Sequence, residues 1–497
     1  MLSGAMLKNV FLKVKNTYSK KEVTAAWLLL SSNILIFLTI WMSRKYDQIC
    51  FDQILFQLKS TSAGAQSALL GSAILQVGIF PAILTLLELR LYPVMAAFVK
   101  KRVLSLAFAA LSVAVLIFTV QTDIYAYMKA DSMKSDFIRS HYVEPDDSIL
   151  HFPEKKRNLI YIFLESIEST YADPTAGEMI TTCYIPELET LAAENLNFSH
   201  TDGLGGALPY PGTTWTAAAM VAQTSGVNIK VSLGEDTYGA EDAFLPGVTS
   251  IGQILEKQGY NQTLLLGSDA EFNGRKAFFT EHGKYTILDT ESLKEAGRLP
   301  EDYNEWWGFE DEKLFDYAKE ELIRLAGEDA PFNLTMLTAD THFPDGYHCD
   351  LCKSEYEVPY ANVLACSSRQ VADFVSWIQE QPFYENTTIV ISGDHLTMDA
   401  AFMEDIDPDY IRTVYDCFIH AAGEPIMEKN RQFATFDLFP TTLSALGVKI
   451  DGERLALGTN LFSDRETLTE QYGYDYLSEE LQKQSDFYEE KLLTESA

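Results

Sequence analysis

The sequence has few basic residues for its length. Of 497 residues, 38 are Lys or Arg and 71 are Asp or Glu, so the formal net charge is −33. A surface that binds nucleic acid needs clustered cations to neutralise phosphates, so this balance argues against nucleic acid as a partner. A phosphate-bearing ligand would have to be held by local features, because the overall field repels anions.

Apolar residues are concentrated near the start of the chain. Three runs without a charged residue occur there, at residues 23–42, 67–87 and 103–120. Each is long enough to cross a hydrocarbon core of about 30 Å, so residues 1–121 are predicted to be a membrane anchor with three transmembrane helices. The first run is too long for the apolar region of a signal peptide and has no small-residue cleavage site after it, so we expect it to remain as an anchor.

The distribution of basic residues predicts an orientation. Lys and Arg cluster before the first run and between the second and the third: Lys8, Lys13, Lys15, Lys20, Lys21, Arg90, Lys100, Lys101 and Arg102. By the positive-inside rule these segments lie in the cytoplasm. Three spans then place everything after the third run on the extracellular or periplasmic side of the cell membrane.

The remaining sequence divides into three parts. Residues 122–157 are polar and are predicted to be a juxtamembrane connector, and residues 466–497 form an acidic C-terminal tail to which we assign no chemistry. Between them, at 158–465, strand-like runs (159–164, 263–266, 332–337 and 388–391) alternate with helical patterns (216–224, 250–257, 311–325, 360–379 and 435–446). This alternation predicts an α/β domain with a mainly parallel sheet flanked by helices.

Each of the four strand-like runs is followed at once by reactive side chains. They are Glu165 after the first, Ser268 and Asp269 after the second, Asp340 and His342 after the third, and Asp394 and His395 after the fourth. The carboxyl ends of parallel strands meet at one edge of the sheet, where open α/β sheets bind ligands. Carboxylate oxygens and imidazole nitrogens are common metal ligands, so a metal site is expected at this edge.

A turn rich in Gly and Pro, residues 205–212, leads into an Ala-rich helical run with Thr216 at the junction. The free N–H groups at a helix N-terminus suit a bound phosphate. Thr216 could equally be a simple N-cap, and Thr213 and Thr214 are close neighbours. A Thr hydroxyl becomes an effective nucleophile only when a metal or a base activates it.

The chain contains six cysteines, of which three lie close together in the sequence. Cys349 and Cys352 form a CxxC motif, and Cys366 follows fourteen residues later. Outside the membrane the favoured interpretation is a disulfide that ties a loop. A zinc ribbon would need a second pair of ligands at matching spacing, and no thioredoxin-like unit surrounds the motif.

Several motifs, taken together in order and spacing, carry a family resemblance over about residues 155–465. They are Leu164-Glu165-Ser166, Gly212-Thr-Thr-Trp-Thr-Ala217, Gly267-Ser-Asp-Ala-Glu-Phe-Asn-Gly-Arg275, Thr341-His342, Ser392-Gly-Asp-His395 and Gly458-Thr-Asn-Leu-Phe462. The set resembles the sulfatase-like phosphoglycerol transferases of the alkaline phosphatase superfamily. These include the lipoteichoic acid synthases and the enzymes that add phosphoglycerol to membrane-derived oligosaccharides.

The resemblance implies roles for particular residues. Glu165, Thr216, Asp394 and His395 would bind one divalent metal, with Mn²⁺ favoured and Mg²⁺ or Zn²⁺ as alternatives. Thr216 would also be the nucleophile, and His342 would lie near the phosphate as a second catalytic and substrate-binding group. Arg275 would hold the substrate head group, with a surface Arg as the alternative. Trp215 stands where lipoteichoic acid synthases tend to have a polar residue, which leaves the acceptor open.

The function that follows is metal-dependent transfer of phosphoglycerol from phosphatidylglycerol, a lipid donor, to an acceptor alcohol of an envelope glycan or polymer through a covalent Thr intermediate. The alternatives are a phosphoethanolamine transferase, a phosphodiesterase or sulfatase-type hydrolase of the same superfamily, and a non-catalytic membrane-tethered binding protein. The turn has no Cys/Ser-x-Pro-x-Arg signature, which disfavours sulfate ester hydrolysis. His348, beside Cys349, is expected to be structural, so a second catalytic metal is disfavoured.

Overall fold

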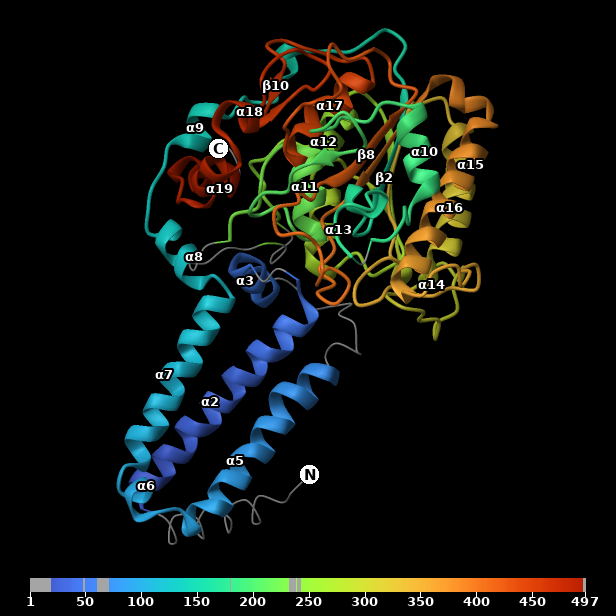
Figure 1. The fold of residues 1–497 in the computed structure, drawn as a ribbon. Coiled ribbons are helices and arrows are strands. Elements are labelled where there is room, and N and C mark those ends of the chain that lie inside the picture. The colour runs from blue at the N-terminus through green and yellow to red at the C-terminus, as the bar shows by residue number, and fades with distance from the viewer. Residues whose placement is uncertain are drawn as a thin grey trace. The chain divides into compact units, whose positions relative to one another are not determined.

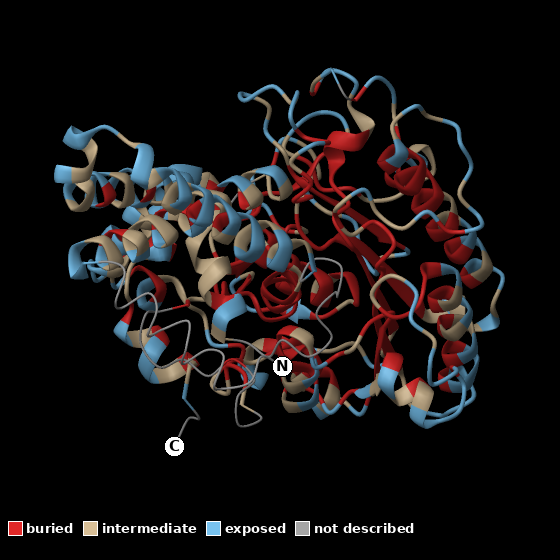
Figure 2. Cartoon of the chain, turned by 90° about the horizontal axis from the view of Figure 1, so that it is seen from below, coloured by how far each residue is buried: buried red, intermediate tan, exposed pale blue. Residues whose placement is uncertain are grey.

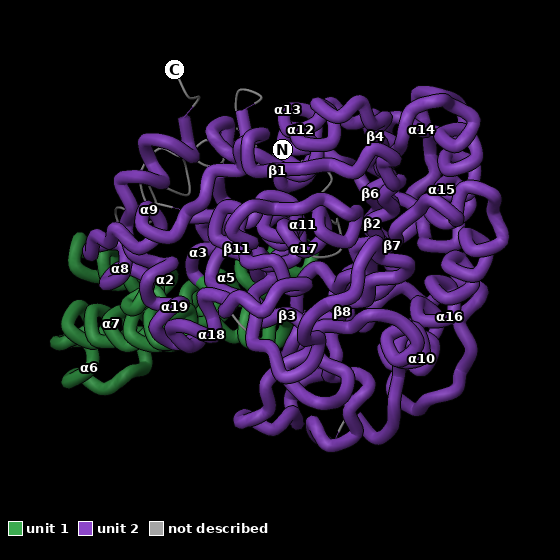
Figure 3. The backbone as a smooth tube through the Cα atoms, turned by 90° about the horizontal axis from the view of Figure 1, so that it is seen from above, with its two compact units in different colours: residues 1–50, 66–126 green, residues 51–65, 127–497 purple. Residues whose placement is uncertain are grey.

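The computed structural model describes residues 19–47, 50–59, 71–178, 180–231, 238 and 243–494. Two compact units make up the chain. Unit 1 contains residues 1–50 and 66–126, and unit 2 contains residues 51–65 and 127–497 (Figure 3). The predicted cytoplasmic residues Lys8, Lys13 and Lys15, and residues 67–70 of the second apolar run, lie outside the described residues.

Unit 1 has three helices that are long and apolar enough to cross a membrane, at Lys20–Lys45, Gly71–Val94 and Val103–Gln121. They coincide with the three predicted runs. The first is α2 (Lys20–Lys45), the second contains η1 (Ile74–Ile79), α5 (Phe80–Leu91) and η2 (Tyr92–Val94), and the third is α7 (Val103–Gln121), preceded by α6 (Ala97–Lys101). Figure 2 shows their surfaces as largely exposed or intermediate, as expected for helices whose apolar side chains face lipid.

A polar contact joins two of these helices. The Asn33 amide of α2 donates to Thr85 Oγ1 (3.0 Å) and to Glu88 Oε2 (3.1 Å), both near or on α5 in the second span. Side-chain hydrogen bonds between apolar helices stabilise their association, because lipid offers these groups no alternative partner.

The core of unit 2 is a seven-stranded sheet in the order β3-β8-β7-β2-β6-β4-β5. The strands are β2 (Asn158–Leu164), β3 (Gly206–Ala207), β4 (Asn261–Leu266), β5 (Thr286–Leu288), β6 (Phe332–Leu337), β7 (Thr387–Gly393) and β8 (Val414–Ile419). Strands β7, β2, β6, β4 and β5 are mutually parallel, whereas β8 runs antiparallel to β7 and β3 antiparallel to β8. The mainly parallel α/β sheet is therefore confirmed, with an antiparallel edge that the sequence did not indicate.

Helices cover both faces of this sheet (Figure 1). Alternate residues of β2 point to opposite faces. Ile160, Ile162 and Leu164 join the core cluster with α10 (Pro186–Glu194), α15 (Asp311–Ala326) and α16 (Pro359–Gln379). On the other face, Tyr161 donates to Gln223 of α11 (Thr216–Ser225), which packs against α17 (Leu438–Ala445) and α12 (Ile251–Lys257). Smaller elements complete the edges: α13 (Arg275–Glu281), α14 (Thr290–Glu295) and the strand pairs β1 (Leu150–His151) with β9 (Lys449–Ile450) and β10 (Arg454–Leu455) with β11 (Gly458–Thr459).

Both segments that the sequence sets apart from the domain contribute to unit 2. The predicted connector contains α8 (Ile124–Asp131) and α9 (Phe137–His141), and it enters unit 2 at residue 127. The tail forms α18 (Leu468–Tyr472), α19 (Tyr474–Gln482) and η9 (Tyr488–Leu492). Leu477 and Leu481 of α19 are fully buried, and Glu470 forms an ion pair with the buried Arg431. Residues 466–494 therefore pack as part of unit 2.

Candidate functional site

The parallel register of β2 and β7 brings the first and fourth predicted strand ends together. Leu164 pairs with Gly393 in the sheet, so the next residues, Glu165 and Asp394, leave the same edge side by side. The Asp394 N–H donates to the Leu164 carbonyl (3.0 Å), which fixes this alignment. The carboxyl edge of the sheet thus gathers Glu165, Asp394 and His395, as the sequence predicts.

Four side chains converge at this edge. Thr216 Oγ1 lies 3.4 Å from Glu165 Oε2 and 3.4 Å from His395 Nε2. His395 Nε2 is 3.6 Å from Glu165 Oε1 and 3.4 Å from Asp394 Oδ2. Glu165, Asp394 and His395 are buried, and Thr216 is partly exposed. The two carboxylates, the hydroxyl and the imidazole therefore face a common point.

Backbone and side-chain hydrogen bonds orient each of these groups. His395 Nδ1 lies 2.7 Å from the Leu396 carbonyl, so it carries the proton and leaves the Nε2 lone pair facing the cluster. Asp394 Oδ1 accepts from the Ser166 and His395 N–H groups (2.8 and 2.7 Å). The Ser166 hydroxyl donates to Glu165 Oε1 (2.8 Å). The directions of Glu165, Asp394 and His395 are thus set before any ligand binds.

The cluster has an excess of negative charge at its centre. Burial, with the nearby Glu165 carboxylate adding to it, raises the pKa of Asp394 to about 7. Burial alone would lower the pKa of His395, but Asp394 and Glu165 outweigh it and leave that pKa raised. Asp394 Oδ2 is buried and has no hydrogen-bond partner among the described residues. A buried carboxylate oxygen without a hydrogen-bond partner is stabilised by a bound cation.

The spacing of the four groups fits a divalent metal. Ligand atoms at about 2.1 Å from a metal are roughly 3.4 Å apart in a tetrahedral arrangement, and the cluster distances run from 3.4 to 3.6 Å. Glu165, Asp394 and His395 also form one of the two groups of ionisable side chains in the described chain whose ligand atoms all lie within 4.8 Å of one another. Glu165, Asp394, His395 and the Thr216 hydroxyl could therefore hold one metal ion.

Thr216 is the first residue of α11, and the helix cap is Trp215, whose side chain makes no capping hydrogen bond. The N-cap alternative for Thr216 is therefore wrong, and its hydroxyl is available to the cluster. Thr213 is committed elsewhere, because its hydroxyl accepts from the Tyr210 N–H (2.9 Å). The unpaired N–H groups of the first turn of α11 lie beside Thr216 and suit an anion.

The start of α11 is packed against a helix from a distant part of the sequence. Helix α3 (Phe51–Lys59) follows the first apolar run but belongs to unit 2. Its Phe56 is fully buried, with its ring centroid 5.1 Å from Trp215 and 5.5 Å from Tyr238. Gln53 of the same helix donates to the Met398 sulfur (3.3 Å). Helix α3 thereby supports the residue that precedes Thr216, a contact that sequence patterns gave no reason to expect.

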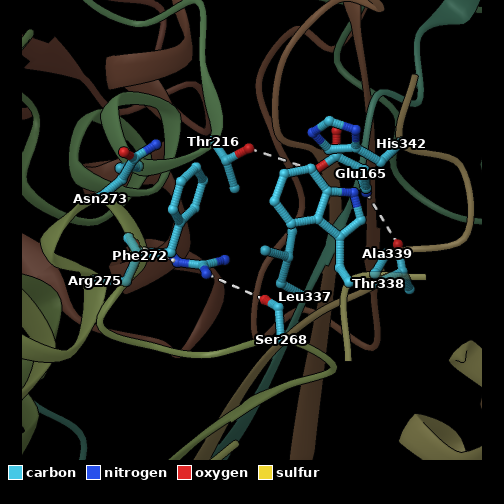
Figure 4. Close-up of a pocket in the computed structure, with 12 residues that line it drawn as sticks. Glu165, Thr216, Ser268, Phe272, Asn273, Arg275, Leu337, Thr338, Ala339 and His342 are labelled. Carbon is cyan, nitrogen blue, oxygen red and sulfur yellow. Dashed lines mark hydrogen bonds between the residues drawn. The ribbon is translucent and has the colours of Figure 1, made fainter. Parts of the chain in front are cut away.

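A pocket opens beside the cluster (Figure 4). Its lining includes Glu165, Thr216, Ser268, Phe272, Asn273, Arg275, Trp307 and His342. Its mixture of aromatic walls with a few polar groups is typical of the lining of a small-molecule site. Trp307 was not predicted; the Trp306-Trp307 pair in a loop is the one sequence signal that could have drawn attention to it.

Arg275 is a wall of this pocket and not a surface residue, since only 5% of it is exposed. Its guanidinium donates to Ser268 Oγ (3.1 Å) and to the carbonyls of Asp269 (2.7 Å) and Phe272 (3.1 Å). Burial lowers its pKa to about 10, so it remains a cation at neutral pH. It can therefore neutralise a bound anion.

His342 reaches the same pocket from the loop after β6. Its Nδ1 lies 2.6 Å from the Phe343 carbonyl, and its ring lies tilted against Trp307, with 4.5 Å between the ring centroids. Burial lowers its pKa to about 4. The imidazole is therefore neutral at pH 7, with the proton on Nδ1 and a free lone pair on Nε2 that can accept a proton.

Other residues predicted at the strand ends do not join the cluster. The Asp340 carboxylate faces Asp311 and accepts from its N–H (3.2 Å). Asp269 accepts from the Glu271 N–H (2.8 Å), and His348 is exposed. The strand-end pattern thus predicts the correct edge of the sheet. Which of the side chains there point into the cluster depends on the tertiary packing.

A sulfatase family model matches residues 157–448. Because this region is more than half of the chain, the protein belongs to the sulfatase family. Phosphoglycerol transferase I of Escherichia coli (strain K12) is 34% identical over 265 residues, which are 52% of this chain and 33% of that protein. The match thus spans about a third of the length of this curated relative.

A solved structure extends the likeness in fold to most of the chain. The integral membrane protein lipooligosaccharide phosphoethanolamine transferase A from Neisseria meningitidis aligns with a TM-score of 0.50 and 15% identity, over 88% of this chain and 87% of that one.

Proposed function

We propose that the protein is a membrane-anchored phosphotransferase that moves phosphoglycerol from phosphatidylglycerol to an alcohol of an envelope glycan or polymer. One observation carries the proposal: the Thr216 hydroxyl lies at the start of a helix, 3.4 Å from both Glu165 and His395. It also lines a pocket whose wall includes the buried guanidinium of Arg275. The 34% identity to a phosphoglycerol transferase supports the choice of transferred group.

One divalent metal would be held by Glu165, Thr216, Asp394 and His395, with Mn²⁺ favoured because most donors are hard oxygens. When bound, such an ion lowers the pKa of a coordinated hydroxyl and neutralises phosphate charge. Mg²⁺ and Zn²⁺ fit the same donor set. Metal analysis of the isolated protein would distinguish the three ions.

In the first half-reaction, Thr216 Oγ forms a bond to the phosphorus of phosphatidylglycerol, and the bond from phosphorus to the diacylglycerol oxygen breaks. The proton lost by Thr216 ends on the departing diacylglycerol oxygen, so charge is balanced. Arg275 and the free N–H groups of α11 bind the non-bridging oxygens, whose charge grows in the transition state. Phe272 and Trp307 enclose the glycerol and exclude water.

In the second half-reaction, the acceptor alcohol attacks the same phosphorus and Thr216 Oγ leaves with a proton. Neutral His342 is suited to take the proton from the attacking alcohol, because its Nε2 carries the free lone pair. The three apolar helices and the basic residues Lys20, Lys21, Arg90, Lys100 and Arg102 support a cell-membrane location with unit 2 on the extracellular or periplasmic side.

The test is adduct mapping on the full-length protein in detergent. With phosphatidylglycerol and no acceptor, mass spectrometry of the digest should find a glycerophosphoryl group on the peptide that contains Thr216. Thr216→Val should carry none, whereas Thr214→Val, the matched neighbour, should keep it. An adduct on another residue, or one that persists in Thr216→Val, contradicts the assignment.

The same experiment separates the alternatives. An adduct formed from phosphatidylethanolamine and not from phosphatidylglycerol would identify a phosphoethanolamine transferase. Release of free glycerol phosphate in the presence of added glycan would identify a hydrolase. No adduct and no bound metal would identify a binding protein.

A further inference from the structure

We propose that Cys349, Cys352 and Cys366 form a second metal site, distinct from the active-site cluster, that binds Zn²⁺. Cys349 and Cys352 lie in the turn between β6 and α16, and Cys366 lies on α16 itself. A metal bound here would link the loop that follows His342 to helix α16, which covers the sheet. This proposal does not depend on the reaction proposed above.

The distances between the sulfur atoms carry the proposal. Cys349 Sγ lies 3.6 Å from Cys352 Sγ and 3.7 Å from Cys366 Sγ, and all three sulfurs lie within 4.8 Å of one another. A disulfide brings two sulfurs to about 2.05 Å. Thiolates bound to zinc at about 2.3 Å are roughly 3.8 Å apart in a tetrahedral site. The three thiols are thus spaced as ligands around an ion, which differs from the disulfide that the CxxC motif favours.

The surroundings also suit thiolate ligands. Cys349 and Cys366 are buried and Cys352 is partly exposed, so the site is shielded on one side and open to solvent on the other. The Gln370 amide donates to Cys366 Sγ (3.5 Å), and the Cys352 N–H closes the turn onto the Cys349 carbonyl (3.1 Å). Hydrogen bonds of this kind orient metal ligands and hold the loop in place.

The fourth position is open to solvent. No fourth His, Cys, Asp or Glu joins the three sulfurs in the part of the chain that the structure describes, so a water molecule would complete the tetrahedron around a bound ion. The CxxC turn and the helix behind it thus supply three of the four ligands, already close together in the folded chain.

Metal analysis of the full-length protein in detergent tests the site. The wild type should bind one more equivalent of zinc than Cys366→Ser, whereas Asp394→Ala should lose the metal of the active-site cluster and keep this zinc. Cys183→Ser, which removes a partly exposed cysteine outside the cluster, should bind as much zinc as the wild type. Equal zinc in the wild type and Cys366→Ser overturns the proposal.

Two measurements on the wild type guard against variants that fail to fold. Cobalt substitution should give a thiolate-to-metal charge-transfer band and strong tetrahedral visible bands, both retained in Asp394→Ala. Alkylation of the unfolded, non-reduced protein should label Cys349, Cys352 and Cys366 together. A Cys349–Cys352 or Cys349–Cys366 disulfide found after alkylation, or a cobalt spectrum without the thiolate band, contradicts the zinc site. Neither result bears on the proposed transferase activity.

Discussion

His395 Nε2 lies 3.4 Å from Thr216 Oγ1, although 179 residues separate the two in the sequence. His395 follows the buried strand β7, and Thr216 begins helix α11 just after a Gly- and Pro-rich turn. In the proposed metal site these two side chains would act as one unit. The variants that test this unit should therefore change metal binding and turnover together.

Removing the Ser166 hydroxyl should weaken metal binding. This hydroxyl donates to Glu165 Oε1 (2.8 Å), and loss of such an orienting contact typically costs 10- to 100-fold in metal affinity. Ser166 has a positive φ of 55°, so Ser166→Gly and Ser166→Ala should be compared, because both lose the hydroxyl and only glycine suits that backbone. Titration of the metal-free protein measures the change. Ser169→Ala, whose hydroxyl contacts Thr413, should bind metal normally; equal weakening in this control would show a general effect of packing.

Arg275→Lys should lower kcat/KM for the lipid donor by about 100-fold, which corresponds to roughly 2.7 kcal/mol. Lysine keeps a charge but loses the planar fork that bonds Ser268, Asp269 and Phe272 at once. Initial rates over a range of donor concentration separate the effect on KM from that on kcat. Lys276→Ala removes the neighbouring exposed cation, which pairs with Glu271, and should leave both constants unchanged. A wild-type rate in Arg275→Lys would remove Arg275 from the head-group site.

Phe56→Ala should destabilise unit 2 and slow turnover, although Phe56 belongs to a helix that follows the first membrane run. The side chain is fully buried against Trp215 and Tyr238, and truncation of a buried Phe typically costs about 3–5 kcal/mol. The cavity lies beside the residue that caps α11, so Thr216 should lose its fixed position. Thermal unfolding and adduct formation are the two readouts. Leu58→Ala, 78% exposed on the same helix, should change neither; loss of stability without loss of turnover would limit Phe56 to a packing role.

Acid should destabilise unit 2 in part through His282. Its Nε2 lies 2.8 Å from the Phe244 carbonyl, and burial lowers its pKa to about 4 from about 6.5 in an unfolded chain. The folded state therefore binds the proton less well, so stability is complete above pH 6.5 and falls as the pH drops through 4, by up to about 3 kcal/mol.

His282→Gln keeps a donor for Phe244 but cannot take up a proton, so its Tm should fall less than that of the wild type between pH 7 and pH 4.5. Scanning calorimetry or a thermal-shift assay of both proteins at each pH gives the comparison. Parallel curves for the two proteins would show that His282 does not contribute to the acid sensitivity.

Local patterns in the sequence were enough to locate much of this molecule. The β-branched run at 388–391 predicted a strand, and the structure extends it to Thr387–Gly393. The junction before the Ala-rich run predicted a helix that begins at Thr216. Long apolar runs and strand periodicity depend on near neighbours in the chain, so they can be recognised without knowledge of the fold. The same holds for Glu165, Asp394 and His395, because parallel strands end at one edge.

Contacts between distant segments could not be read in this way. The strand β8 (Val414–Ile419) is fully buried but was not among the predicted strands, and its antiparallel direction is set by its pairing with β7. Trp307 lines the pocket because its loop folds back beside His342. Helix α3 packs on Trp215 through one side chain, Phe56. Each of these depends on loop closure and on complementary shape, which sequence separation conceals.

The sequence by itself therefore determined the class of fold, the edge of the sheet that carries the site, and the chemical types of the four converging groups. Only the tertiary structure decided that Thr216 is free of a capping role, that Arg275 and His342 share one pocket, and that three sulfurs lie at metal-ligand spacing. The reason is physical: residue type and period fix which groups are available near a strand end, whereas their directions follow from packing and hydrogen bonds made across the whole domain.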